Sequence, residues 1–249
     1  MCLIIVGWRV HPHFPLVVAA NRDEFYARPT ALAARWPDAP EVLGGRDLEA
    51  GGTWLGITDS GRFAAVTNVR EPGAPAGQRS RGDLTREFLL GNQSAADYAE
   101  QIDGDTFAGF NLLLADADAL YYRTNRHGAV EKLEPSIYGL SNHRLDSPWP
   151  KLLSARQRFA DALQTLPDET EFFRLLADDA TVDDEKLPET GVSLEWERLL
   201  SAIFVKSENY GTRASTVLLQ HNNGTIRLHE RSFGHGGVLL QSSVISTGV

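Results

Sequence analysis

Short apolar runs rich in Val and Ile, paired around turn-like stretches, dominate the hydrophobic pattern of this chain. Residues 2–8 and 14–20 are predicted to form the two strands of a hairpin, because the turn-like HPHFP lies between them. A second hairpin is predicted over 51–69, with DSG at its turn. Further hairpins are predicted over 109–125, 129–142 and 213–233.

Helical periodicity occurs in two places, each time as a pair of segments. Residues 83–91 and 94–102 form the first pair, and Ser94 is the expected N-cap of its second helix. Residues 149–166 and 168–179 form the second pair, with apolar side chains three and four residues apart. Hairpins and helix pairs in this order exclude an alternating parallel sheet. They predict an α+β protein, two antiparallel sheets covered by two helical layers, in a single domain over 1–249.

Composition narrows the classes of partner. The 249 residues carry a net charge of −9, and no helix gathers Lys and Arg on one face, which argues against nucleic acid or an anionic membrane. One cysteine cannot form an internal disulfide. No signal-like segment and no apolar window long enough for a transmembrane segment is present, so we expect a cytoplasmic protein.

The single cysteine, Cys2, directly follows Met1 at the start of the first predicted strand. It is either filler in a buried strand or a nucleophile whose own α-amine becomes the base once Met1 is removed. An α-amine has an ordinary pKa of about 7.7–8.0, so it can accept the thiol proton near neutral pH. The thiolate is the reactive form, and a nearby guanidinium lowers the pKa of a thiol. Such a site also needs an acid to orient the amine and amide donors for an oxyanion hole.

The stretch AANRDEF supplies candidates at the end of the second predicted strand. Its polar residues are Asn21, Arg22, Asp23 and Glu24. A solvated turn is the alternative interpretation of four polar residues at a strand end. In an antiparallel hairpin, however, the second strand returns to the start of the first, so Arg22 and Asp23 are expected to approach Cys2.

Several segments of the chain resemble the NRDE family, which is related to the transport and Golgi organisation protein 2 of eukaryotes. They are, in order, MCLI, ANRDEFYARP, GGRD, GGTWLGI, TN, GFNLL, GLSN and YGTRASTV, and they extend from residue 2 to about 218. The resemblance implies a four-layer αββα sandwich of the N-terminal-nucleophile hydrolase-like type. This agrees with the layers predicted from the hydrophobic pattern.

The NRDE family is similar, more distantly, to cysteine amide hydrolases that cleave penicillin V and conjugated bile acids. By residue type, this similarity implies that Cys2 is the nucleophile and that Asp23 holds the α-amine. Asn68 or Asn142 would be a donor of the oxyanion hole. Arg213 would be the late arginine of those enzymes.

Arg22, the implied charge near the thiolate, departs from the pattern of those hydrolases. They separate the arginine from the aspartate by two residues, whereas here Arg22 and Asp23 are adjacent. Neighbouring residues of a strand point to opposite faces, so both are expected to line one site only where the segment has already turned.

Two functions follow from the resemblance. The first is hydrolysis of a non-peptide carbon–nitrogen (amide) bond of an N-acyl compound through an acyl intermediate on Cys2, with no cofactor required. The second is non-catalytic binding or trafficking of haem or lipid on the same fold, because members of the family have been connected with haem handling and lipid homeostasis. The expected substrate-binding residues are Asn21, Glu24, Trp54, His143 and Tyr210.

Haem binding would use some of the same side chains. Trp54 and Tyr210 would wall the pocket, and Arg22 or Arg213 would pair with a propionate. The possible axial ligands are Cys2 and His143.

Two other motifs point away from metal and nucleotide chemistry. His11 and His13 have a spacing that places two imidazoles on one side of a strand, but no third or fourth ligand is near them, so no metal site is predicted. The glycine-rich phosphate-binding motifs of nucleotide-binding proteins do not occur in the chain.

Overall fold

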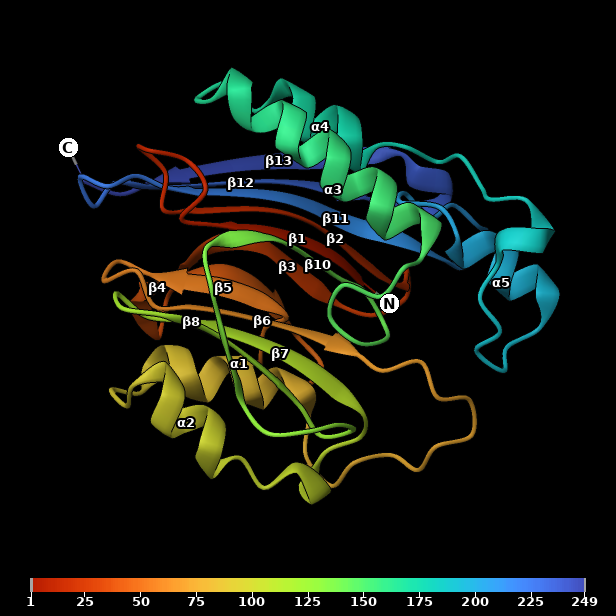
Figure 1. Ribbon diagram of the computed structural model, residues 1–249, viewed down its shortest axis with the longest axis horizontal. Coiled ribbons are helices and arrows are strands. Elements are labelled where there is room, and N and C mark those ends of the chain that lie inside the picture. Colours follow the sequence, from red (N-terminus) through yellow and green to blue (C-terminus); the bar gives the residue numbers. More distant parts are fainter. Residues whose placement is uncertain (1, 249) are drawn as a thin grey trace.

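The computed structural model describes residues 2–248, and they are arranged in four layers (Figure 1). Helices α3 and α4 cover the outer face of one antiparallel sheet, a second antiparallel sheet packs beneath it, and helices α1 and α2 cover the far side (Figure 1). The predicted αββα sandwich is therefore confirmed.

The first sheet has six strands within residues 2–248, in the spatial order β10-β1-β2-β11-β12-β13. The predicted first hairpin is its β1–β2 pair, and the predicted last hairpin is its β11–β12 pair. The strands are β1 (Cys2–Trp8), β2 (Leu16–Phe25), β10 (Ser136–Leu140), β11 (Tyr210–Gln220), β12 (Ile226–Phe233) and β13 (Leu239–Ser246).

The second sheet has seven strands within the same residues, and each strand pairs with its neighbour in sequence. The predicted hairpin at 51–69 is the β5–β6 pair of this sheet. The strands are β3 (Thr30–Trp36), β4 (Ala39–Asp47), β5 (Leu55–Thr58), β6 (Phe63–Asn68), β7 (Phe110–Ala115), β8 (Leu120–Thr124) and β9 (Glu131–Leu133).

The predicted helix pairs are present, and the side chain of Ser94 caps the second helix of the first pair by accepting from the Asp97 amide. The α-helices of the described residues are α1 (Arg81–Leu90), α2 (Ala95–Gln101), α3 (Pro150–Ala162), α4 (Thr170–Leu176) and α5 (Leu194–Leu200). Single 3₁₀ turns are η1 (Gly104–Thr106), η2 (Leu163–Thr165), η3 (Asp184–Lys186) and η4 (His235–Gly237).

The predicted hairpin over 129–142 is wrong. Its two strands belong to different sheets, since β9 pairs with β8 and β10 pairs with β1. The chain crosses from one layer to the other between them. Both strands carry short apolar runs, and local pattern does not distinguish a hairpin from two strands that find separate partners. Strands β3, β4 and β13 and helix α5 were not predicted from the sequence.

Apolar side chains fill the spaces between the layers. Residues alternate along β1, so Ile4 and Val6 pack between the sheets while Leu3 and Ile5 pack against α3 and α4. Burial on both faces explains the unbroken apolar run at the start of the chain. A third cluster lies between the second sheet and α1 and α2.

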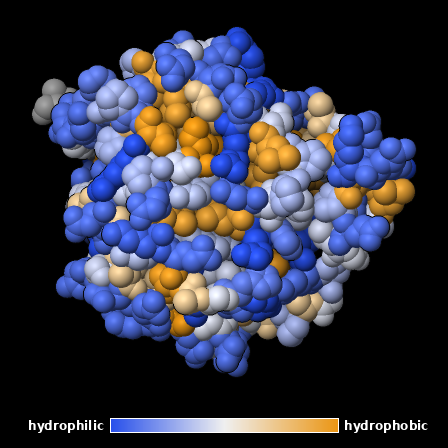
Figure 2. All heavy atoms as spheres, viewed as in Figure 1, coloured by the Kyte–Doolittle hydropathy of each residue, from blue (hydrophilic) through white to orange (hydrophobic). Residues whose placement is uncertain are grey.

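The outer surface is mostly polar on the face drawn in Figure 2, where apolar side chains form separate groups. Within the part of the chain that the structure describes, no helix has the length and apolar character needed to cross a membrane.

Candidate active site

A cavity of about 240 Å³ lies at one end of the β1–β2 hairpin, and Cys2 is part of its wall. Cys2 is the first residue of β1, is 8% exposed, and pairs in register with Arg22 of β2. The sulfur-bearing residue therefore borders a cavity instead of being enclosed by the apolar core. The predicted site residues that line this cavity are Cys2, Arg22, Asp23, Glu24, Trp54 and Asn68.

The thiol of Cys2 is held in its neutral form by its surroundings. Burial raises the pKa of Cys2, and the carboxylates of Asp23 and Glu24 raise it further, while Arg22 opposes them. Removing water disfavours a thiolate, and nearby negative charges do the same. This cysteine therefore needs a base beside it in order to react near neutral pH.

Asp23 occupies the opposite face of β2 from Arg22, as the alternation of a strand requires. Its Oδ1 accepts a hydrogen bond of 2.7 Å from the Thr212 hydroxyl, and it is 2% exposed. Burial raises the pKa of Asp23, whereas buried Lys151 and the bond from Thr212 lower it. The carboxylate thus sits in a dry environment next to positive charge.

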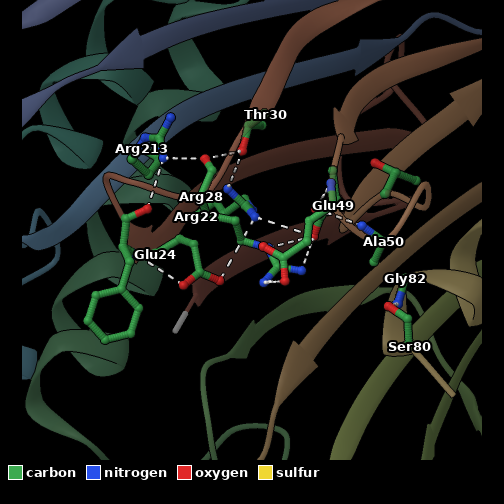
Figure 3. A network of polar contacts seen from close by, with 12 residues as sticks. Arg22, Glu24, Arg28, Thr30, Glu49, Ala50, Ser80, Gly82 and Arg213 are labelled. Atoms are coloured by element: carbon green, nitrogen blue, oxygen red, sulfur yellow. Dashed lines mark hydrogen bonds and ion pairs between the residues drawn. The ribbon is translucent and has the colours of Figure 1, made fainter. Parts of the chain in front are cut away.

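Arg22 faces the space between the sheets, where its guanidinium donates to the hydroxyl of Thr30 at 3.2 Å. The same guanidinium lies 3.9 Å from carboxylate oxygens of both Glu24 and Asp47. Figure 3 shows this network, in which Arg22, Glu24 and Arg28 come together beside the turn that carries Glu49. Although Arg22 and Asp23 point to opposite faces and β2 has not turned there, both line the cavity.

The register of the neighbouring strand changes at this point. Thr212 of β11 pairs with Asp23 and Ala214 pairs with Arg22, so Arg213 is the extra residue of a bulge. Bulges re-aim side chains next to binding sites. Here the bulge directs Arg213 away from the cavity lining and toward the β2–β3 turn.

The two asparagines from the sequence prediction are joined to each other. Asn142 is fully buried, its Oδ1 accepts from the backbone nitrogen of Cys2 at 3.4 Å, and its Nδ2 donates to the carbonyl of Asn68 at 2.9 Å. Asn68, the last residue of β6, lines the cavity itself. Asn142 therefore connects the start of β1 to the end of β6 across the two sheets.

Asn21 and Arg213 bind backbone groups outside the cavity lining. Asn21 donates to carbonyls of Leu176 and Ile203 at 2.8 and 2.9 Å, which ties β2 to the helical layer. Arg213 donates from one nitrogen toward three carbonyl oxygens of the β2–β3 turn, at 2.9 to 3.0 Å. These contacts hold the strands that carry the site.

His143 and Tyr210 also lie off the cavity lining. His143 is exposed, and its Nδ1 lies 2.8 Å from the hydroxyl of Ser147. Tyr210 is buried and donates to the backbone carbonyl of Asp23 at 3.2 Å. Tyr210 thus supports the strand that carries the carboxylate.

Several cationic residues near the site were not predicted, among them Arg28, Arg46 and Arg79 on the cavity wall. Arg81, the first residue of α1, lines the cavity. Lys151 is buried in α3, where its ammonium donates to the carbonyl of Leu200 at 2.7 Å, and burial lowers its pKa to about 8. Helical spacing places Lys151 on the same face as Ala155 and Phe159, and this was a usable signal for a buried lysine. Arg81 lies just before the predicted helix at 83–91, in a polar stretch that gave no signal for a site residue.

Comparison with known proteins places the chain in a family. The family model described as Transport and Golgi organisation 2 matches residues 1–235. The chain belongs to this family. Similar curated proteins include the Transport and Golgi organization 2 homologs of Mus musculus and Homo sapiens. These are 35% and 36% identical to the chain over 258 residues, with 93% of each chain covered. The Transport and Golgi organization protein 2 of Drosophila melanogaster is 29% identical over 64% of each chain.

Solved structures show the same architecture. A Caenorhabditis elegans ortholog of N-acylethanolamine-hydrolyzing acid amidase superposes with a TM-score of 0.53 at 15% identity, covering 88% of this chain and 92% of its own. The C2A mutant of a conjugated bile acid hydrolase from Clostridium perfringens gives 0.54 at 10% identity, covering 99% and 92%. The chain therefore has the N-terminal-nucleophile hydrolase fold.

Proposed function

We propose that this protein is an N-terminal cysteine amidohydrolase, which cleaves a non-peptide amide bond through an acyl intermediate on Cys2. The observation that carries the proposal is that Cys2 and Asp23, which come from two paired strands, line one cavity. The likeness to the fold of two amide hydrolases supports it. The mechanism depends on the removal of Met1, and Met1 lies outside the described residues.

In the proposed reaction the free α-amine of Cys2 accepts the thiol proton, and the thiolate attacks the amide carbon. The negative charge moves to the carbonyl oxygen, where Asn68 is the proposed donor on the cavity wall. The protonated amine then gives its proton to the leaving nitrogen, and the carbon–nitrogen bond breaks to leave a thioester. Water, deprotonated by the same amine, hydrolyses the thioester and releases the acid and the free thiol.

Asp23 and Asn142 are proposed to position the nitrogen that acts as base. Asn142 already accepts a hydrogen bond from the nitrogen of Cys2. Asp23 supplies a buried carboxylate, which accepts a hydrogen bond from the hydroxyl of Thr212. A fixed, hydrogen-bonded amine keeps its lone pair directed at the thiol, so less entropy is lost in reaching the reactive geometry.

Haem or lipid binding on the same fold is the alternative, and only part of its predicted contacts come together. Trp54, Arg22 and Cys2 lie on the cavity wall, whereas Tyr210 and the alternative contacts Arg213 and His143 are engaged elsewhere. The cavity, about 240 Å³, is also smaller than the ~300–1,000 Å³ that encloses a drug-sized ligand. It suits the reactive end of an amide whose remainder extends outward.

The experiment begins with the intact mass of the purified protein, which is expected to lack methionine. Hydrolysis of N-octanoyl amides by this protein is then compared with that of Cys2→Ala, for which we expect no turnover. Brief reaction should leave an octanoyl group on the N-terminal peptide of the unmodified chain only. Retained methionine in an active preparation, or full turnover by a correctly folded Cys2→Ala, would overturn the proposal.

A further inference from the structure

The lining of the cavity carries more positive than negative charge. Among residues 2–248, five arginines contribute to its wall, against three carboxylates. The arginines are Arg22, Arg28, Arg46, Arg79 and Arg81, and the carboxylates are those of Asp23, Glu24 and Asp47. The protein as a whole has a net charge of −9, so this gathering of arginines on one cavity wall departs from the acidic average of the chain.

Four of these arginines have carboxylate partners. Arg28 lies 2.8 Å from its nearer partner, and Arg46 and Arg79 make close ion pairs at the cavity rim. Arg22 lies between two carboxylates at 3.9 Å. The partners are Asp47 and Glu49 for Arg28, Asp38 for Arg46, Glu87 and Asp83 for Arg79, and Glu24 and Asp47 for Arg22.

Arg81 differs from the other four. Among residues 2–248 no carboxylate lies within ion-pair distance of its guanidinium, and its one hydrogen bond there runs to the carbonyl of Gly109 at 3.3 Å. Burial lowers the pKa of Arg81, while negative charge on Cys2, when its thiol is ionised, and on Glu24 raises it. A half-buried guanidinium has lost hydration that a carboxylate or phosphate can replace with charge-assisted hydrogen bonds.

The position of Arg81 in its helix adds to this preference. It is the first residue of α1, and Ser80, Arg81 and Gly82 all line the cavity. The first turn of a ten-residue helix carries partial positive charge, which favours an anion at that end. The guanidinium and the helix therefore act in the same direction, on a cavity whose wall also includes Cys2.

We propose that the cavity recognises N-acyl compounds that carry an anionic group close to the amide, and that Arg81 binds this anion. The inference rests on the proposed amide hydrolysis for the identity of the substrate, but the anion site itself does not depend on turnover. A carboxylate and a phosphate share this chemistry. An N-acyl ethanolamide with an identical acyl chain is neutral and has no anionic group for Arg81 to bind.

The first test uses Cys2 as a chemical probe, since it is the only thiol of the chain. Iodoacetate is anionic and iodoacetamide is neutral, and both alkylate the thiolate. Their ratio of rates cancels any change in thiolate fraction and reports the local potential. We expect Arg81→Gln to lower the iodoacetate/iodoacetamide ratio about three- to fivefold, the effect of a partly exposed ion pair. Arg81→Lys should preserve most of it.

Arg86→Gln is the matched control, because Arg86 lies on the same helix, pairs with Asp83 and is outside the cavity lining. It removes the same charge from the chain and should leave the ratio unchanged. An unchanged ratio in a folded Arg81→Gln, or an equal decrease in Arg86→Gln, would overturn the anion site. This result is independent of whether the protein hydrolyses any amide.

The second test compares three substrates with one acyl chain. They are N-octanoylglycine, N-octanoyl phosphoethanolamine and the neutral N-octanoylethanolamine. We expect Arg81→Gln to raise KM about tenfold for an anionic substrate, as loss of a charged hydrogen bond predicts, and to leave the neutral one within about twofold. The stronger response of glycine or phosphate identifies the anion. Equal effects on the anionic and neutral amides would contradict the proposal, and no turnover of any amide would instead count against the proposed hydrolysis.

Discussion

The backbone nitrogen of Cys2 donates a hydrogen bond of 3.4 Å to Oδ1 of Asn142, a residue 140 positions away in sequence. The side-chain nitrogen of Asn142, Nδ2, donates to the carbonyl of Asn68. One buried side chain thus links the candidate nucleophile to the opposite sheet. In the proposed mechanism, this contact orients the nitrogen that serves as base.

We expect Asn142→Ala to weaken both the fold and the site. It leaves the Asn68 carbonyl and the Cys2 nitrogen without their buried partner, which predicts a loss of about 2–3 kcal/mol in the free energy of unfolding. Urea denaturation measures this, and Gln93→Ala, which removes an exposed side-chain bond to Gln101, is the control. A stability equal to that of the unmodified protein would contradict the role assigned to Asn142.

Arg22 and Glu24 are expected to shift the titration of Cys2 in opposite directions. Burial is the largest cause of the raised pKa of the thiol. Arg22 lowers this pKa, and Glu24 raises it. Arg22→Gln should therefore move the pH dependence of iodoacetamide alkylation to higher pH, and Glu24→Gln should move it to lower pH. Shifts of the same sign in both variants would show that packing, and not charge, controls the thiol.

Lys151 predicts a pH dependence of stability. Burial lowers its pKa from 10.5 to about 8, so between these values the unfolded chain binds a proton that the folded protein does not. By linkage, the contribution of Lys151 to the free energy of unfolding rises as pH rises from about 8 to 10.5. Lys151→Met should flatten this rise in denaturation curves, whereas Lys206→Met, which removes an exposed lysine, should keep it. A slope that persists in Lys151→Met would refute the assignment.

Arg213 is predicted to act on stability through the β2–β3 turn. Its guanidinium holds the carbonyls of Phe25, Tyr26 and Arg28, so Arg213→Ala should lower the free energy of unfolding by about 2 kcal/mol. Arg174→Ala, which breaks an exposed helical pair with Glu171, should change it by about 0.5 kcal/mol or less. If Arg213→Ala instead abolishes turnover at unchanged stability, Arg213 acts on substrate.

The β1–β2 hairpin shows what local pattern can predict. Two apolar runs around a short turn fold back on each other, so the approach of Arg22 to Cys2 follows from sequence spacing alone. The hairpin predicted at 129–142 shows where the same reasoning fails. The two halves of that segment pair in different sheets, and no neighbouring residue carries that information.

The sequence by itself determined the layered α+β architecture, the position of Cys2 at the head of a buried strand, and its pairing with the end of β2. These depend on the periodicity of apolar residues and on connections of a few residues. Only the tertiary structure decided that Asn142 reaches the nitrogen of Cys2, that Arg213 turns toward a backbone turn, and that Arg81 borders the cavity. Those contacts join elements far apart in the chain, and the packing of four layers brings them together.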